Sequence, residues 1–508
     1  MPDRKKIKDI KNLAKILSAQ RKGNKTIVHS DGIFDILHIG HIRHLEQAKG
    51  LGDILIVTIT PDRFVNRGPG RPVFTETLRA EAIASLNCVD YVAINSSPTI
   101  EDTLRILKPN IFVQGSEYKN PAPEAANEIA NQIKALQDIG ATIAFTEDIA
   151  FSSTSLINRY LSNLPDEMHE YLTLFRQRYD QKEIEQLIDQ FEDMNVLVIG
   201  DTILDEYQYC EAIGKSSKDP VLALKYQSHD LFAGGVLAVA NHVANFVKNV
   251  HLVTVLGEKD DYEAFIRSQL QSNINPYFIK QDNAATIIKR RFIEGYSLNK
   301  LFEIYVMDDS GLTPEKDKQL CKYLKDHVSE YDLVIAADFG HGAISLEAVH
   351  ALADSAPFLA INTQANAGNR GFHTVSRYPR ADYVCIAEHE IRLEKRTLNG
   401  DLRPMMKDIS KRLDSTRMVV TRGRKGALVW NNRGEFVEIP SFAHNIVDRV
   451  GAGDAFFAVT SLAAAKGVPD EILGFIGNVV GSLAVEIVGN KKSIDKTSTK
   501  KYIASLMR

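Results

Sequence analysis

Apolar residues recur with two different periods along the first part of the chain, and these periods predict alternating strands and helices. Between residues 25 and 160, short apolar runs predict strands at 25–29, 54–58, 91–94, 111–113 and 142–145. Helical spacing of apolar residues predicts helices between some of them, at 77–86 and 124–139. Strands that alternate with helices form parallel sheets covered on both faces, so this pattern predicts a doubly wound α/β domain.

A second region of the same kind begins at the apolar run 195–199 and continues to the end of the chain. The residues between the two regions are polar with helical spacing, which is typical of a connecting segment. A chain of 508 residues is also too long for one hydrophobic core. We therefore expect two doubly wound α/β domains, over 25–160 and 194–508, joined by a helical linker over 161–193.

Composition and charge narrow the classes of function. The hydrophobic content of 44% and the charged content of 25% are ordinary for a soluble globular protein. A net charge of −4 argues against nucleic acid as a partner, and the absence of a long apolar run argues against a membrane protein. The scattered cysteines predict free thiols in the reducing cytoplasm; they are Cys88, Cys210, Cys321 and Cys385.

Two histidines stand at the predicted junction between the first strand and the following helix. His38 and His41 are three positions apart, which places both rings on one face of a first helical turn. The start of a helix offers unpaired N–H groups to an anion, and Gly40 lets a phosphate approach the backbone. Two imidazole donors at that position can bind a triphosphate and stabilise the charge that develops on it.

The stretch from Ser30 to Lys49 resembles the cytidylyltransferase-like nucleotidyltransferases, which share a His-x-Gly-His motif that contacts nucleotide phosphates. The resemblance implies a Rossmann-like fold and gives His38 and His41 a catalytic role. The nucleotide site that it implies consists of Gly32, Phe34, Asp35, His38, Gly40, His41, Arg79, Ser153, Thr154 and Ser155. Relatives carry a basic residue near Gln114 and Ser-Thr-Thr in place of 153–155, so the acceptor and the choice between CTP and ATP stay open.

A glycine-rich helix start near the end of the chain carries a second chemistry. Gly451, Ala452 and Gly453 would leave backbone N–H groups open to a γ-phosphate. Asp454 in the next position can accept a proton from an attacking sugar hydroxyl. The stretch resembles the second signature of the ribokinase-like (PfkB) sugar kinases, in which this Asp is the catalytic base.

The same resemblance implies further residues of a ribokinase-like domain. Its nucleotide and phosphate site would contain Thr421, Gly423, Gly426, Gly451, Ala452, Gly453 and Asn478. Its sugar site would contain Asp205, Gly234, Gly235, Lys289, Arg291 and Asp454. Glu390 would act on Mg²⁺ through water. Ala238 and Ala387 replace the asparagines of two family motifs, which predicts an altered sugar pocket and magnesium shell.

The bifunctional ADP-heptose synthases, which the chain resembles, contain the same two domains in the opposite order. The resemblance implies a kinase that uses ATP and Mg²⁺ to phosphorylate the anomeric hydroxyl of a sugar, with a heptose phosphate as the expected substrate. It also implies a transferase that joins a sugar-1-phosphate to a nucleotide from CTP or ATP, and a homodimer formed through the kinase-like domain.

Two alternatives stay open. In the first, the transferase is active and the kinase-like domain only senses a sugar or dimerises. In the second, a polyol-phosphate cytidylyltransferase is fused to a kinase of unrelated sugar specificity.

Overall fold

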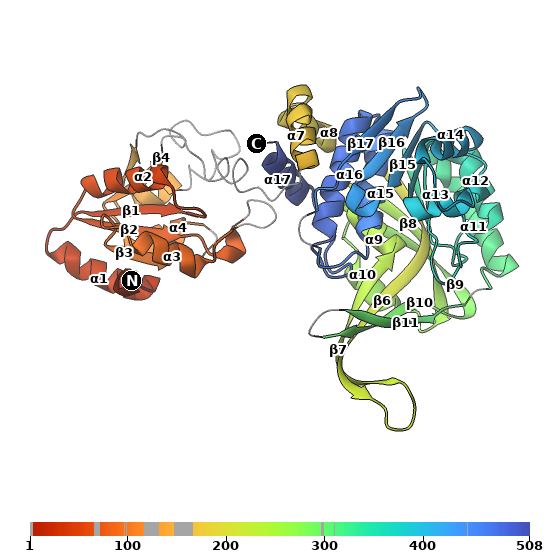
Figure 1. The fold of residues 1–508 in the computed structure, drawn as a ribbon, viewed down its shortest axis with the longest axis horizontal. Coiled ribbons are helices and arrows are strands. Elements are labelled where there is room, and N and C mark those ends of the chain that lie inside the picture. Colours follow the sequence, from red (N-terminus) through yellow and green to blue (C-terminus); the bar gives the residue numbers. More distant parts are fainter. Residues whose placement is uncertain are drawn as a thin grey trace. The chain divides into compact units, whose positions relative to one another are not determined.

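The computed structural model describes residues 4–65, 72–95, 97, 99–115, 132–146, 166–295, 299–308, 310–443 and 446–507. The chain divides into two compact units, Met1–Asn163 and Leu164–Met507, and each is described by itself (Figure 1). Among the described residues, no helix has both the length and the apolar character needed to cross a membrane.

The first unit contains a five-stranded parallel sheet in the order β3-β2-β1-β4-β5. The strands are β1 (Ile27–Gly32), β2 (Ile54–Ile59), β3 (Tyr91–Ile94), β4 (Ile111–Gly115) and β5 (Thr142–Thr146). The chain order reverses between β1 and β4. In open α/β sheets, ligands bind beyond the carboxyl ends of the strands at such a reversal.

Helices cover both faces of this sheet, as the alternating pattern predicts. They are α1 (Ile10–Lys22), α2 (Ile39–Gly50), α3 (Glu76–Ala84), α4 (Glu101–Leu107) and a helical segment over 132–138. Leu45 of α2 and Ile83 of α3 share one apolar cluster with Leu55 of β2. Leu13 of α1 packs on the other face, in a cluster that includes Ile56.

The second unit is built on a larger sheet in the order β11-β10-β6-β12-β13-β14-β15-β16-β17, with β7 and β8 also paired to β6 and β9 paired to β8. Its first six strands are β6 (Asn195–Lys215), β7 (Leu222–Gly235), β8 (Asn249–Lys259), β9 (Ile274–Ala285), β10 (Ile287–Glu294) and β11 (Lys300–Val306). The others are β12 (Leu333–Asp338), β13 (Leu359–Thr363), β14 (Tyr383–Ala387), β15 (Arg417–Thr421), β16 (Ala427–Asn431) and β17 (Phe436–Ile439).

One strand, β6, belongs to two parts of this unit. Residues 195–201 pair with β8 on one side, and 196–200 pair with β12 on the other, inside the core sheet. Residues 202–215 then pair with β7, and 203–210 with β10, to form a lid sheet with β11. In Figure 1 the far end of the β6–β7 ribbon extends away from the body of the unit.

Helices pack on both faces of the core sheet of the second unit. They are α7 (Asp166–Arg178), α8 (Gln181–Asp189), α9 (Val236–Ala244), α10 (Glu263–Gln269), α11 (Pro314–His327), α12 (Leu346–Ser355), α13 (Glu388–Glu394), α14 (Leu402–Arg412), α15 (Ala452–Ala465), α16 (Asp470–Ala484) and α17 (Lys496–Leu506). The ring of Phe175 in α7 stacks on Phe475 of α16 at a centroid distance of 4.3 Å. Helices α7 and α8, from the segment 161–193, thus contribute to the apolar core of the second unit.

Candidate active sites

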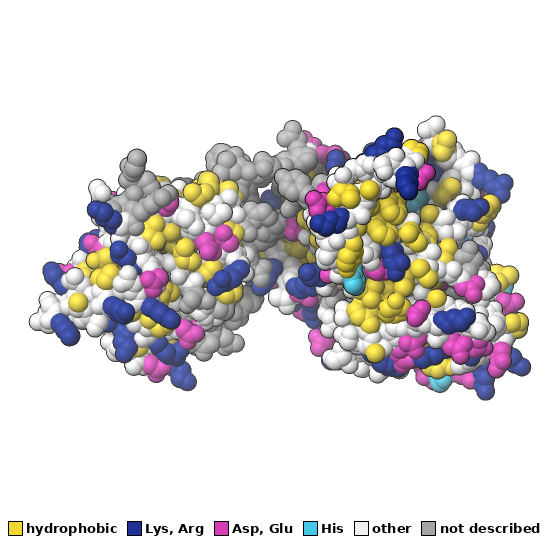
Figure 2. Space-filling view, turned by 90° about the horizontal axis from the view of Figure 1, so that it is seen from below, with side chains coloured by type: hydrophobic (Ala, Val, Ile, Leu, Met, Phe, Trp, Pro, Cys, Tyr) yellow, Lys and Arg dark blue, Asp and Glu magenta, His cyan; other side chains and the backbone are white. Residues whose placement is uncertain are grey.

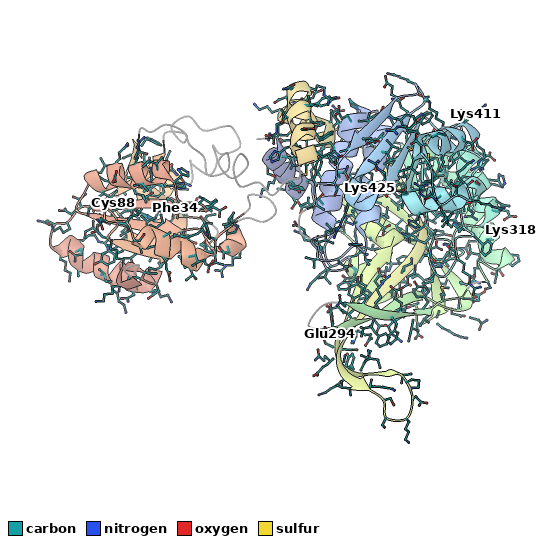
Figure 3. The ribbon with its side chains drawn as sticks, viewed as in Figure 1. Phe34, Cys88, Glu294, Lys318, Lys411 and Lys425 are labelled. Carbon is teal, nitrogen blue, oxygen red and sulfur yellow. The ribbon has the colours of Figure 1, made fainter. Side chains whose placement is uncertain are left out.

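The first candidate site lies where β1 ends and α2 begins, at the carboxyl edge of the five-stranded sheet. Phe34, labelled in Figure 3, turns the link between them with a φ of 48°, which is unusual for a residue other than glycine. Its ring packs edge-on against His41 at a centroid distance of 5.1 Å. A Cβ at Gly32 would meet the Phe34 ring at 2.9 Å, so this packing requires glycine. The link therefore fixes one side of the His41 ring.

His38 and His41 form a stacked pair at the first turn of α2. Their ring centroids lie 3.8 Å apart and their planes differ by 23°. His38 is the N-cap and Gly40 the second residue of the helix, so open backbone N–H groups lie beside both rings. Burial, together with His38 and His44, lowers the pKa of His41 to about 3, and burial also lowers the pKa of His38. At neutral pH both rings are uncharged donors beside an anion-binding helix start.

Asp35 and Arg79 hold the segments around this pair. Asp35 accepts a hydrogen bond from the backbone N–H of Val73 at 2.6 Å. The Arg79 guanidinium is buried and donates to neighbouring oxygens, which are the backbone carbonyls of Ile33, Thr60 and Phe74 and the carboxylate of Asp62. Arg79 thereby positions the β1–α2 link, and its contact with a nucleotide phosphate stays a prediction.

One further residue noted in the sequence lies on β4, and three others follow β5 in the sequence. Gln114 donates its side-chain amide to Oε1 of Gln132 at 2.8 Å. Ser153, Thr154 and Ser155 lie outside the described residues, so their contact with phosphates stays a prediction.

Sequence reasoning passed over one residue beside this site, His44. Its ring bonds to the hydroxyls of Ser30 and Thr146, which lie on two different strands. The available signal was its spacing, because His44 follows His41 by the same three positions that separate His41 from His38.

The second candidate site lies where β6 passes the end of β7 and the start of α9. Asp205 is buried, and an added Cβ at Gly234 would overlap its carboxylate. Gly235 has a φ of 56° and is the N-cap of α9, and a Cβ there would meet the carbonyl oxygen of Asp201 at 2.6 Å. Both predicted glycines are therefore required by the close approach of β6.

Lys289 and Arg291 both lie on β10, which pairs with β6, but their side chains have different partners. Arg291 is ion-paired with Asp205 and, at 2.9 Å, with Glu303. Lys289 is 5% exposed, and among the described residues its ammonium makes no hydrogen bond or ion pair. Burial lowers the pKa of Lys289, although the Asp205 carboxylate opposes this shift. A buried ammonium without a paired carboxylate is suited to an anionic ligand, whereas Arg291 orients Asp205.

The glycine-rich segment forms the start of α15. Gly451 is the N-cap with a φ of 82°, and Ala452 and Gly453 are the first two helical residues. Asp454 follows in the first turn. Burial and the Asp205 carboxylate raise the pKa of Asp454 to about 7, with Lys289 partly offsetting them. A carboxyl group with this pKa beside open helix N–H groups is suited to general-base work on a substrate that carries phosphate.

A buried carboxylate that sequence reasoning did not single out connects this segment to the lid sheet. Asp448 accepts hydrogen bonds from Tyr207 Oη at 2.6 Å, from Lys300 Nζ at 2.7 Å and from the Gly489 backbone N–H at 3.0 Å. Burial opposes its charge, but the Lys300 and Tyr207 bonds outweigh burial and lower the pKa of Asp448. Lys300 is the first residue of β11, so this ion pair joins a lid strand to the loop before α15.

The loop between β15 and β16 contains the predicted nucleotide residues. Thr421 ends β15, and Gly423 and Gly426 have φ values of 58° and 77°. A Cβ at Gly426 would overlap the carbonyl of Ile439, so only glycine fits there. Asn478 of α16 approaches the same carbonyl with Nδ2 at 3.4 Å. The structure therefore brings Gly426 and Asn478 to one backbone segment.

Both carboxylate oxygens of Glu390 are occupied by backbone N–H groups, unlike those of a direct metal ligand. Its two carboxylate oxygens accept the backbone N–H groups of Ala387 at 2.6 Å and Ala365 at 3.0 Å. Burial raises its pKa, and its charge contributes to the raised pKa of Asp454. In the described part of the chain, no group of three or more His, Cys, Asp or Glu side chains is arranged to hold a metal ion. The role of Glu390 in the outer shell of a Mg²⁺ ion, held through water beside the phosphates, stays a prediction.

Asp201 connects the core part of β6 to the loop after β12. Its carboxylate accepts hydrogen bonds from the backbone N–H groups of Phe339 and Ala343, both at 2.9 Å. Burial and the neighbouring Asp338 carboxylate raise the pKa of Asp201 to about 6. This contact holds the segment 339–343 against the strand that also carries Asp205.

Two family models match separate regions of the chain. The model of the pfkB family of carbohydrate kinases matches residues 193–497, and the cytidylyltransferase-like model matches residues 30–159. The chain belongs to the pfkB carbohydrate kinase family and carries a cytidylyltransferase-like domain ahead of it. Both predicted resemblances, and the prediction of two α/β domains, are confirmed.

Curated relatives and solved structures add detail. The bifunctional protein HldE of Syntrophotalea carbinolica is 37% identical over 115 residues, which is 22% of this chain and 24% of that protein. HldE of Campylobacter jejuni is 42% identical over 125 residues, which is 24% of this chain and 27% of that protein. The chain thus spans about a quarter of the length of these relatives.

Among solved structures, phosphofructokinase-2 from Escherichia coli in complex with potassium aligns with a TM-score of 0.52 at 17% identity. The alignment covers 62% of this chain and 100% of that one, and it shows a shared fold.

Proposed function

We propose that the protein is a bifunctional enzyme of nucleotide-activated sugar synthesis. Its second unit phosphorylates the anomeric hydroxyl of a sugar with ATP. Its first unit transfers a nucleotidyl group from CTP or ATP to a sugar-1-phosphate and releases pyrophosphate. The observation that carries this proposal is the presence of two anion-binding helix starts in one chain, one with the stacked pair His38–His41 and one with Asp454.

In the transferase step, an oxygen of the sugar-1-phosphate attacks the α-phosphorus of the nucleoside triphosphate. The bond from the α-phosphorus to its bridging oxygen breaks, and pyrophosphate leaves with the bonding electrons. The sugar phosphate is already anionic, so the protein supplies alignment and charge stabilisation. The neutral rings of His38 and His41, with the first N–H groups of α2, donate hydrogen bonds to the phosphate oxygens.

In the kinase step, Asp454 takes the proton of the sugar hydroxyl as its oxygen bonds to the γ-phosphorus, and ADP departs. The backbone from Gly451 to Gly453 binds the transferring phosphoryl group. Lys289 supplies a buried positive charge beside Asp205 and Asp454. Magnesium, when bound with the nucleotide, neutralises phosphate charge.

The sugar is proposed to be a heptose phosphate, from the resemblance to ADP-heptose synthases. The buried ammonium of Lys289, which has no hydrogen bond or ion pair among the described residues, supports a substrate that is itself anionic. The kinase site is expected to use ATP and Mg²⁺. The protein is expected in the cytoplasm, and the four free cysteines support a reducing compartment.

The second unit is also proposed to form a homodimer through its lid sheet. Large apolar side chains are exposed on β6, β7 and β11, and they are Ile213, Leu222, Tyr226, Phe302 and Ile304. Figure 2 views the molecule from the side of the β6–β7 ribbon and shows hydrophobic side chains gathered on the second unit. Exposed apolar area on this scale is typical of an interface between protein subunits.

A second candidate function keeps the transferase but makes the kinase-like unit a sensor or dimerisation module. The observation that favours it is the placement of Glu390, whose oxygens are already engaged by two backbone N–H groups. The replacement of family asparagines by Ala238 and Ala387 points in the same direction. In this case the unit binds ATP or a sugar phosphate without turnover.

The test uses the full chain with a panel of sugar phosphates and each nucleoside triphosphate, with ADP, pyrophosphate and nucleotide-sugar products measured separately. His41→Ala is expected to slow pyrophosphate release by about 10²–10³-fold and to leave ADP formation unchanged. Asp454→Asn is expected to slow sugar-dependent ADP formation by about 10²–10⁴-fold and to leave pyrophosphate release unchanged. Each variant is thus the matched control for the other site.

Three outcomes decide between the functions. Pyrophosphate release at the normal rate in His41→Ala shows that the first site is wrongly assigned. ADP formation at the normal rate in Asp454→Asn shows that the base is wrongly assigned. Binding of ATP without any sugar-dependent ADP formation in the wild type selects the sensor function.

A further inference from the structure

His44, the second histidine within α2, makes two side-chain hydrogen bonds to strands of the sheet. Nε2 of His44 lies 2.8 Å from Oγ of Ser30, and Nδ1 lies 2.7 Å from Oγ1 of Thr146. The two partners are 14 positions before and 102 positions after His44 in the sequence. Ser30 is fully buried, and Thr146 is 4% exposed. Both hydroxyls therefore depend on protein partners, and the His44 ring supplies one to each.

These bonds reach two strands that are not neighbours. Ser30 lies on β1 and Thr146 ends β5, and β4 lies between these strands in the sheet. A single ring that bonds to both strands resists rotation of α2 about its axis and its displacement away from the sheet. An apolar side chain at this position could fill the space but would not fix a direction, because dispersion contacts are weakly directional.

A third contact of Thr146 indicates the direction of these hydrogen bonds. Oγ1 of Thr146 lies 3.5 Å from the carbonyl oxygen of Gln114, so its one hydroxyl hydrogen donates there. Thr146 must then accept from Nδ1–H of His44, and Nε2 of His44 accepts from the hydroxyl of Ser30. The Nδ1–H tautomer of His44 is compatible with these three contacts.

His44 lies three residues after His41 on the same helix, so the position of α2 sets the position of His41. The two rings also interact, since His44 is one of the groups that lower the pKa of His41. The first turn of α2, which carries the proposed phosphate donors, is thereby fixed by contacts made farther along the helix.

We propose that His44 is a positioning residue of the transferase site: through Ser30 and Thr146 it fixes α2, and so places His41 against the phosphates, without touching the substrate itself. This inference rests on the proposed transferase function. It predicts that loss of the His44 bonds reduces the rate of the chemical step more than it weakens nucleotide binding, because the donors remain present but are misplaced.

The experiment measures kcat and KM for pyrophosphate release by the full-length protein. His44→Phe keeps a planar ring and removes both bonds; kcat is expected to fall about 10-fold to 100-fold, with KM for the nucleotide changed less than about threefold. His44→Gln, whose amide offers one donor and one acceptor, is expected to recover part of kcat. Thr146→Val is expected to lower kcat, whereas Thr142→Val, at the exposed start of the same strand, is the matched control and should leave it unchanged.

A double variant tests whether His44 acts through His41. In His41→Ala one of the positioned donors is gone, so adding His44→Phe should lower kcat by a smaller factor than it does in the wild type. Losses that multiply in the double variant overturn the inference, as does a His44→Phe protein with the normal kcat.

The ring nitrogens give a readout that does not depend on turnover. Long-range ¹H–¹⁵N spectra of histidine-labelled protein should show His44 as the Nδ1–H tautomer. The His41 ring signals should shift in Thr146→Val and stay in place in Thr142→Val. Wild-type protein that releases no pyrophosphate with any nucleotide contradicts the proposed function, and the spectra then decide about His44 alone. Unshifted His41 signals in Thr146→Val would contradict the inference.

Discussion

Burial of single side chains sets the protonation states on which both sites depend. Burial lowers the pKa of His41 to about 3, and it raises the pKa of Asp454 to about 7. In both cases a site removed from water disfavours the charged form of the group. His41 is thereby kept as a neutral donor, and Asp454 is kept as a base whose strength suits neutral pH.

The pKa of Asp454 predicts the pH dependence of the kinase step. The base must be ionised to accept a proton, so the protonated fraction is inactive. Sugar-dependent ADP formation, measured as kcat/KM, should reach a plateau above pH 7 and fall about tenfold per pH unit well below it. A profile that stays flat from pH 8 to pH 5.5 would contradict the assignment of Asp454 as the base.

His242 predicts a pH dependence of stability in the second unit. This buried side chain accepts the Ile494 backbone N–H on Nδ1 at 3.0 Å, and burial lowers its pKa from 6.5 to about 4. Below pH 6.5 the unfolded chain therefore binds more protons than the folded chain, so the free energy of unfolding falls as the pH falls. One such group lowers the free energy of unfolding by about 1.4 kcal/mol at pH 5.5 relative to pH 8.

Urea unfolding followed by the fluorescence of Trp430, the single tryptophan, measures this effect in the second unit. In His242→Asn, the amide oxygen can still accept the Ile494 N–H but does not titrate. Between pH 8 and pH 5.5, the free energy of unfolding of this variant should fall by about 1.4 kcal/mol less than that of the wild type. The exposed His350→Gln is the matched control, and an equal loss in all three proteins would refute the role of His242.

At the residue scale, the sequence predicted the positions of required glycines better than it predicted side-chain contacts. The glycines at 234, 235, 426 and 451 stand where the backbone is approached closely or has a positive φ, as their motifs indicate. The motifs did not distinguish Arg291, which is paired, from Lys289, which is not. Nor did they show that Arg79 donates to backbone carbonyls. These differences depend on partners that are distant in sequence.

The lid sheet is joined to the loop before α15 by the Lys300–Asp448 pair. Lys300 is 32% exposed and Asp448 only 8%, so removal of the ammonium leaves a mostly buried carboxylate with fewer partners. Lys300→Met should lower the free energy of unfolding by about 1–2 kcal/mol, between the values for exposed and fully buried pairs. Hydrogen exchange should also become faster at the amides of β10 and β11.

Lys248→Met is the control for this substitution, because it removes the same group from a pair with Asp193 that is exposed on both sides. It should change the free energy of unfolding by less than about 1 kcal/mol. Equal effects of the two substitutions, with unchanged exchange in β10 and β11, would show that the Lys300 pair does not hold the lid.

At the element scale, the alternating pattern predicted every strand of the first sheet to within a few residues. The runs at 91–94 and 142–145 correspond to β3 (Tyr91–Ile94) and β5 (Thr142–Thr146). The pattern did not single out α1 or α4, and it could not show the length of β6. Apolar spacing reports which face of an element is buried, but not which partner covers it.

The boundary between the two units decides which fragments fold. Phe175 of α7 stacks on Phe475, and Arg178 forms an ion pair with Glu471 at 2.7 Å. A fragment 164–508 should therefore fold with one cooperative transition. A fragment 181–508 lacks α7 and should be less stable by at least about 3 kcal/mol, the loss typical of removing one buried aromatic side chain.

Trp430 fluorescence during urea unfolding measures both fragments, and Phe175→Ala in the longer one is the matched variant. The free energy of unfolding of that variant should be lower by about 3–5 kcal/mol if the stacking on Phe475 is a main contact of α7. Equal stability of the two fragments would mean that α7 is a linker and not part of the folded unit. The fragment 1–163 should fold separately, because its sheet is covered on both faces by its own helices.

The uninterrupted course of β6 restricts how the lid sheet can move. The same strand pairs inside the core sheet up to Asp201 and inside the lid from Thr202 onward, so no loop separates the two parts. Opening of the lid must then bend or twist a continuous strand near residue 201, as an elastic deformation and not as a rotation about a hinge. Because the Asp201 carboxylate holds the segment 339–343, such a twist would carry strain from β6 to the loop that follows β12. The resting shape of the proposed sugar site would accordingly be set by the stiffness of one backbone segment.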